Sequence, residues 1–270
     1  MSDGRVVPRR ESCRASAVAA VVTCVAMLAA VAACAAPPPV TAVPAPSVET
    51  RAVAAGWGEG SSWRDQHEQI CRIGADREVD VVLLGDSITQ GFGGPGRRVA
   101  SPGQEAFDRW LAPRRAANFG ISGDRTQHLL WRIDHGAFER VRPRVVALLI
   151  GTNNLSAGDA PVDAAAGVAA IVDRLAALPR PPRVLLFALF PRGADAADPV
   201  RGRVAELNQR LSRVAAERHA RFLDLAGLFL LADGRANREH LAGDFLHLTA
   251  AGYGAWAAAL AAAIDELQSE

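Results

Sequence analysis

The fold is decided by the stretch DVVLLGDSIT, which runs from Asp80 to Thr89. Its first half is a short, continuous apolar run that ends at Gly85. A run of this kind is typical of a strand that is buried on both faces of a parallel sheet. Ser87 follows directly after the predicted strand, so we expect its hydroxyl at the carboxyl-terminal rim of the sheet.

The same pattern recurs along the chain and alternates with stretches that have a helical pattern. Further strands are predicted at residues 116–119, 145–150, 184–189 and 221–225. Helices are predicted at residues 126–133, 161–178, 199–217 and 249–267. This alternation predicts one α/β domain whose parallel sheet is covered by helices on both faces. Domains of this kind bind ligands at the carboxyl ends of the strands.

Three residue types of a serine hydrolase lie at or near predicted element ends. Ser87 can act as a nucleophile, and Asp244 precedes His247 by three residues just before the last helix. That spacing can direct the carboxylate at one imidazole nitrogen and leave the other free to take a proton. Taken singly, Ser87 also fits a helix N-cap and His247 a surface histidine.

Gly120 and Asn153 follow two other predicted strands. A tetrahedral intermediate of acyl transfer needs hydrogen-bond donors directed at its oxyanion. The backbone N–H groups of Ser87 and Gly120 and the side-chain amide of Asn153 can supply them. Glycine and asparagine are also ordinary turn residues, so neither one alone indicates acyl transfer. The indication comes from four sequence blocks in this order, which contain Ser87, Gly120, Asn153 and the pair Asp244/His247.

Composition excludes several other kinds of chemistry. The 270 residues include 30 arginines and no lysine, against 29 acidic residues, for a net charge of +1. The balance argues against a broad nucleic-acid surface, and the absence of lysine excludes P-loop, Schiff-base and Ser-x-x-Lys sites. The four cysteines and the pair His67-Glu68 lack the spacing of a zinc site. The glycine-rich loop at residues 91–96 opens no clear helix, so it does not indicate a dinucleotide-binding site. We therefore expect no metal and no cofactor.

The amino terminus has the pattern of an export signal. Basic residues precede an uncharged run at residues 15–33, and residues 31–34 resemble the lipobox of bacterial lipoproteins, with Cys34 as the lipidated residue. A signal cleaved to release a secreted protein and an uncleaved anchor are the alternatives. We predict a lipoprotein-type signal peptide at residues 1–33, a Pro/Ala-rich tether at 34–55 and the folded domain at 56–270. The expected location is the cell envelope, with membrane attachment through Cys34.

The four blocks resemble those of the SGNH (GDSL-type) hydrolase superfamily. Gly85-Asp86-Ser87 is similar to its nucleophile block, Gly120 and Asn153 to the next two, and Asp244-x-x-His247 to the last. Within it, the chain is most similar to the catalytic subunits of intracellular platelet-activating-factor acetylhydrolase, over about residues 78–268. The resemblance implies a flavodoxin-like three-layer α/β/α sandwich with a five-stranded parallel sheet, no metal, and hydrolysis of a carboxylic ester.

The resemblance has limits that leave the substrate open. The acetylhydrolase subunits are cytosolic, whereas this chain carries an export signal, and Ser122 stands where they usually have glycine. We expect a serine esterase acting on a short-acyl or acetyl ester of a small molecule, lipid or glycan. A glycan O-deacetylase, a lysophospholipase and a non-catalytic surface binding module are alternatives. Acyl length, the alcohol part, the oligomeric state and the role of residues 91–98, which we expect to shape the pocket, stay open.

Overall fold

The structure is a computed structural model that describes residue 1 and residues 37–269. Residues 2–33 of the predicted signal peptide and Cys34 lie outside the described residues. Within the described part of the chain, no helix is long and apolar enough to span a membrane.

One sheet of five parallel strands forms the centre of the domain, in the order β2-β1-β3-β4-β5. Its strands are β1 (Val81–Gly85), β2 (Ala116–Gly120), β3 (Val145–Leu149), β4 (Arg183–Phe187) and β5 (Arg221–Leu223). Every residue of β1, β2 and β3 is buried, as expected for strands that are covered on both faces. The strand order reverses between β1 and β3, which is where doubly wound sheets of this order bind ligands.

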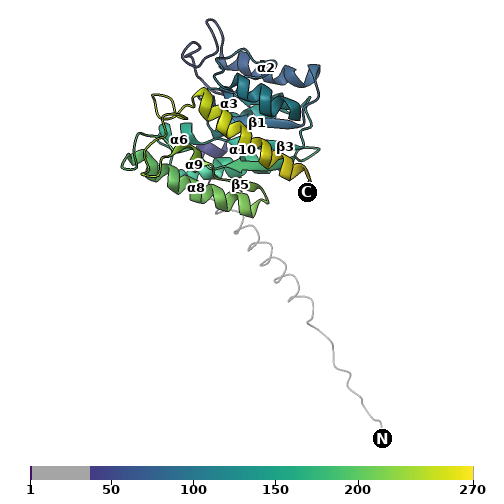
Figure 1. Ribbon diagram of the computed structural model, residues 1–270. Helices are drawn as coiled ribbons and strands as arrows, with labels where there is room; N and C mark the ends of the chain where they lie inside the picture. The colour runs from purple at the N-terminus through teal and green to yellow at the C-terminus, as the bar shows by residue number, and fades with distance from the viewer. Residues whose placement is uncertain (2–36, 270) are drawn as a thin grey trace. The chain divides into compact units, whose positions relative to one another are not determined.

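Helices cover both faces of the sheet. The α-helices are α2 (Trp63–Asp76), α3 (Ser87–Gln90), α4 (Gln104–Ala106), α5 (Thr126–Arg132), α6 (Thr152–Ser156), α7 (Pro161–Ala176), α8 (Pro199–Glu217), α9 (Ala226–Phe229) and α10 (Ala250–Ser269). Helix α10 lies across β1 and β3, and α8 lies beside β5 (Figure 1). Helices α5, α7 and α8 pack in sequence against one another. The predicted α/β/α fold with a five-stranded parallel sheet is confirmed.

Short turns of 3₁₀ and π helix complete the described chain. They are η1 (Val40–Ala42), η2 (Phe107–Leu111), η3 (Ala112–Arg114) and η4 (Ile133–Ala137). Helix α2 was not predicted from the sequence, although Ser62 caps it and exchanges hydrogen bonds with Asp65 in a capping box.

The folded unit begins at Pro39, so the prediction of a tether that continues to residue 55 is wrong. Residues 39–57, here called the N-terminal strap, pack on the domain. The buried Thr41 donates a hydrogen bond through Oγ1 to Asp163 O at 2.5 Å and accepts one at its carbonyl from Thr126 Oγ1 at 2.8 Å. At the other end of the strap, Trp57 Nε1 donates to Gln90 Oε1 at 2.8 Å. The proline-rich composition indicated an extended chain, but it does not reveal these long-range contacts.

The glycine-rich loop at residues 91–98 braces the end of β2. Arg97 Nη1 donates to the carbonyl oxygens of Asn118 and Gly120, both at 2.8 Å. Asn118 Nδ2 in turn donates to Gly93 O at 2.9 Å. The loop therefore positions a strand end at the rim of the sheet.

Candidate active site

Ser87 lies at the carboxyl end of β1, as the first residue of α3. Glycine is required at the end of β1, because a Cβ added at Gly85 would clash with Leu149 O on the neighbouring strand and with Thr89 Oγ1. Asp86 caps α3 by accepting the Ile88 N–H at Oδ1, 3.0 Å away. Burial raises the pKa of Asp86 to about 7, against the opposing effect of that hydrogen bond.

His247 joins Ser87 to Asp244. The imidazole Nε2 lies 2.9 Å from Ser87 Oγ, and Nδ1 lies 2.6 Å from Asp244 Oδ2. Asp244 Oδ1 also accepts the backbone N–H of His247 at 3.0 Å, which fixes the carboxylate beside the ring. The structure thus brings the three predicted side chains together across 160 residues of sequence.

The Asp244 carboxylate is stabilised in its charged form. Partial burial raises its pKa, but hydrogen bonds from the His247 ring and from the backbone N–H groups of His247 and Leu246 lower it by more. The net pKa lies below the ordinary value of an aspartate. The carboxylate is therefore available to orient the imidazole and to stabilise its protonated form.

Asn153 presents an amide on the same rim, after β3. Its Nδ2 donates one hydrogen bond to Asp124 O at 2.9 Å, which leaves its second N–H available to a ligand. Asn153 and Gly123 both line a cavity of about 420 Å³. Gly123 has a φ of +82°, and among the described residues its N–H donates no hydrogen bond.

The prediction that Gly120 supplies an oxyanion donor is wrong. Its N–H donates to Asn118 Oδ1 at 2.8 Å inside the domain. The glycine is required for packing, because an added Cβ would lie 2.3 Å from Gln90 N. Gly123, three residues further along the chain in the loop that follows β2, donates no hydrogen bond among the described residues and lines the cavity, so it is the better candidate.

A buried ion pair that was not predicted from the sequence fixes the loop after β2, which carries Gly123. Asp124 and Arg132 are both fully buried, with their charged groups 2.8 Å apart. Trp63 Nε1 from α2 donates to Asp124 Oδ1 at 2.7 Å, and Arg132 Nη1 donates to Phe119 O at 2.7 Å. Because the Asp124 carbonyl holds Asn153, the ion pair fixes both the loop and the amide. Asp124 follows Gly123 in the sequence, but nothing local indicates its distant partners.

Replacing Arg132 by methionine should lower the free energy of unfolding by about 3–5 kcal/mol, because Asp124 would remain as an uncompensated buried charge. Chemical denaturation measures the change. Arg174→Met is the matched control, since Arg174 pairs with Asp134 on the surface. That control should change stability by less than about 1 kcal/mol. Equal effects of the two substitutions would contradict the importance of the buried pair.

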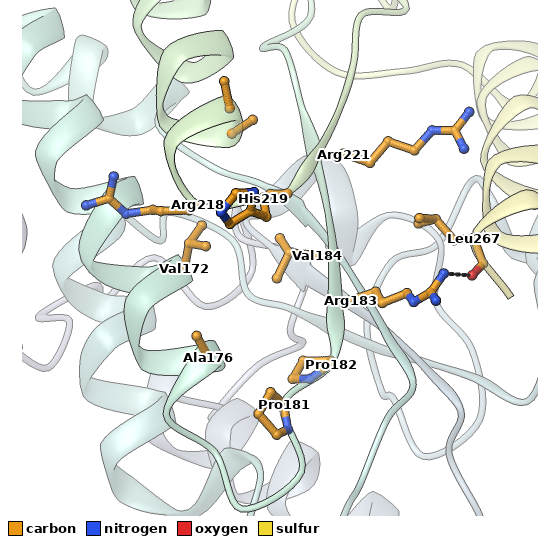
Figure 2. Close-up of a pocket in the computed structure, with 13 residues that line it drawn as sticks. Val172, Ala176, Pro181, Pro182, Arg183, Val184, Arg218, His219, Arg221 and Leu267 are labelled. Atoms are coloured by element: carbon orange, nitrogen blue, oxygen red, sulfur yellow. Dashed lines mark hydrogen bonds between the residues drawn. The ribbon is translucent and has the colours of Figure 1, made fainter. Parts of the chain in front are cut away.

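A larger cavity of about 750 Å³ lies at the opposite ends of β4 and β5. Figure 2 shows Arg183, Arg218, His219 and Arg221 around it, with Arg183 donating a hydrogen bond to Leu267 O. Its lining includes no serine, cysteine or carboxylate. It therefore lacks the groups for nucleophilic chemistry. Among residues 37–269, no cluster of three or more His, Cys, Asp or Glu side chains is placed to hold a metal ion.

The rim thus carries the groups that acyl transfer requires. A hydroxyl contacts an imidazole, the imidazole contacts a carboxylate, and a free amide N–H lies beside a cavity. Ser87 follows β1 and Asn153 follows β3, which pair directly, so both lie at the point where the strand order reverses.

Comparisons with known proteins identify the family of the chain. The model of the GDSL-like Lipase/Acylhydrolase family matches residues 83–255. The alpha2 subunit of human platelet-activating factor acetylhydrolase IB is 33% identical over 193 residues, which are 71% of this chain and 78% of the subunit.

Two solved structures share the fold. A GDSL-like lipase from Bacteroides thetaiotaomicron superposes with a TM-score of 0.61 at 18% identity, covering 74% of this chain and 97% of that one. A variant of the acetyl xylan esterase Axe2 from Geobacillus stearothermophilus superposes with a TM-score of 0.56 at 22% identity, covering 67% of this chain and 92% of that one. From the family match and the relatives, the chain belongs to the GDSL-like lipase/acylhydrolase family and is an acylhydrolase or esterase.

Proposed function

We propose that Ser87, His247 and Asp244 form the catalytic triad of a carboxylic ester hydrolase. The proposal rests above all on the 2.9 Å contact between His247 Nε2 and Ser87 Oγ. This distance allows the imidazole to take the serine proton as the hydroxyl attacks the ester carbonyl. Asp244 orients the ring through Nδ1 and stabilises the imidazolium that forms.

The reaction proceeds in two steps through an acyl-enzyme. The attack of Ser87 Oγ forms a tetrahedral intermediate, and protonated His247 then gives its proton to the departing alcohol. Water, deprotonated by the same imidazole, attacks the acyl-enzyme and releases the carboxylic acid. The backbone N–H groups of Ser87 and Gly123 and the amide of Asn153 donate to the oxyanion in both steps.

The ester carries a short acyl group in this proposal. Support comes from the relatives, which are named acetylhydrolases, and from the acetyl xylan esterase that shares the fold. A series of p-nitrophenyl esters from acetate to palmitate tests the assignment. We expect kcat/KM to be highest at the acetate end and to fall as the chain lengthens. A maximum at palmitate would overturn the short-acyl assignment and leave the triad untouched.

Replacing Asn153 by alanine removes one oxyanion donor and should lower kcat on the order of 10²–10³ with a smaller change in KM. Steady-state kinetics on p-nitrophenyl acetate measures both constants. Ser156→Ala is the matched control, because Ser156 lines the same cavity and its hydroxyl donates to Thr152 O. A variant at Asn153 that lost affinity but kept kcat would remove this residue from the oxyanion hole.

The chain is also proposed to be exported and anchored through a lipid on Cys34. The supporting observation is the sequence pattern of residues 1–34, which precede the folded unit. Metabolic labelling with a palmitate analogue, in the full chain and in Cys34→Ala, tests the anchor. Equal labelling of the two chains would contradict it.

A further inference from the structure

Exposed apolar side chains gather on the N-terminal strap. Among the described residues, the large hydrophobic side chains that are exposed are Met1, Val40, Val43, Val48, Val53, Val162 and Leu231. Four of these seven lie between residues 40 and 53, although the strap is a small part of the chain. A cluster of exposed apolar residues marks an interaction surface more often than single ones do.

Contacts of the strap bring a fifth valine to this cluster. The hydrogen bond from Thr41 Oγ1 to Asp163 O places Val40 and Val43 beside the first turn of α7, where Val162 is half exposed. Further along the strap, Val48 lines the same cavity as Gly123 and Asn153. Of these five valines, we call Val40, Val43, Val48 and Val162 the valine patch, and Val48 places it at the cavity that Gly123 and Asn153 line.

The strap holds these side chains in place. Its carbonyl at Thr41 accepts from Thr126 Oγ1, and Ala45 N donates to Gln127 O at 3.1 Å. The backbone between them is therefore tied to α5 and α7. The valines therefore lie on a fixed surface. Val40 and Val48 are 75% and 88% exposed, and contact of their apolar side chains with water is unfavourable, so a partner that covered them would gain free energy.

The length of chain before the strap indicates the partner. Only five residue steps separate Cys34 from Pro39, where the folded unit begins. A fully extended segment of that length spans at most about 18 Å. A lipid on Cys34 would therefore hold the strap next to the bilayer, whereas a tether reaching to residue 55 would have held the domain away from it.

We propose that the valine patch docks on the lipid bilayer to which the chain is anchored, and so turns the cavity lined by Val48, Gly123 and Asn153 toward the membrane surface. This inference rests on the proposed anchor at Cys34. Burying one valine contributes at most about 1.5–3 kcal/mol, so the patch alone binds a membrane weakly. The anchor supplies the high local concentration that makes weak docking effective.

The emission of a fluorophore attached at position 43 tests the docking independently of enzyme activity. Processing before Cys34 would remove Cys13 and Cys24 and block the Cys34 thiol, so Cys71→Ser removes the remaining thiol. The full chain that carries this change is purified from the membrane fraction and reconstituted in vesicles of phosphatidylcholine and phosphatidylglycerol. An environment-sensitive fluorophore is attached at Val43→Cys or, as the control, at Leu231→Cys. We expect a blue shift and quenching by quencher-labelled lipid at position 43 only. A fluorophore at position 43 that remains in water would overturn the proposal.

Three other outcomes also overturn it. A full chain recovered only in the soluble fraction has no anchor to support docking. A blue shift without vesicles, growing with protein concentration, would assign the patch to a second copy, and one independent of concentration would assign it to the chain's own amino-terminal segment.

Activity provides the second arm. The double variant Val40→Asp/Val43→Asp should keep its turnover of soluble p-nitrophenyl acetate and lose about tenfold on an acetyl ester of a lipid in the same vesicles. Leu231→Asp should alter neither. Equal rates of double variant and wild type on the vesicle ester would contradict the docking. A wild type that hydrolyses neither ester would instead contradict the proposed function. The fluorescence experiment would still test the docking, because it does not depend on ester hydrolysis.

Discussion

Ser87→Ala should lose nearly all ester hydrolysis, with a fall in kcat that approaches roughly 10⁶, as in other serine triads. The change removes the atom proposed to attack the carbonyl, while His247 and Asn153 remain in place. Steady-state kinetics on p-nitrophenyl acetate, with thermal unfolding as a check on folding, provides the measurement.

Ser122→Ala is the matched control for that loss. Ser122 precedes Gly123 on the loop beside the cavity, and its backbone N–H rather than its hydroxyl bonds Gln90 Oε1. We expect this control to keep wild-type turnover. Full activity in Ser87→Ala would show that another group is the nucleophile.

Asp244→Asn should lower kcat by about 10⁴, in line with the effect of the same change in other serine triads. The amide removes the negative charge beside Nδ1, so the imidazolium formed during attack loses its stabilisation and the ring its orientation. Asp233→Asn is the control, because Asp233 pairs with Arg235 at an exposed site. A loss of less than tenfold at Asp244 would mean that His247 is oriented by other groups.

The sequence predicted those parts of the fold that depend on local patterns. All five strands lie where short apolar runs indicated them, and α8 begins and ends at the predicted residues. The grouping of Ser87 with Asp244 and His247 could also be predicted, because parallel strands end at a common rim and the Asp-x-x-His spacing is short. The strands needed periodicity only, whereas the grouping of Ser87 with Asp244 and His247 also drew on the resemblance to the SGNH superfamily.

Other features depend on which distant atoms meet, and these could not be predicted. Whether Gly120 or Gly123 has a free N–H is decided by the Asn118 side chain, which occupies the first of them. The burial of Asp124 depends on its ion pair with Arg132 and on the hydrogen bond from Trp63. Trp63 belongs to α2, which precedes β1 in the sequence and is 61 residues away from Asp124.

The amino-terminal boundary was misplaced for a similar reason. Proline-rich composition indicates an extended backbone, and an extended backbone can be either solvated or packed. The contacts of Thr41 with α5 and α7 decide that it is packed.

Labelling with a fluorophosphonate probe shows whether Ser87 is an activated nucleophile, because the probe reacts far faster with a serine that a neighbouring base activates than with an ordinary one. We expect a single phosphonyl adduct, located by peptide mass spectrometry on Ser87, that forms far more slowly in His247→Ala. A chain that hydrolyses esters while Ser87 stays unmodified, or that is modified equally fast without the His247 imidazole, would contradict it.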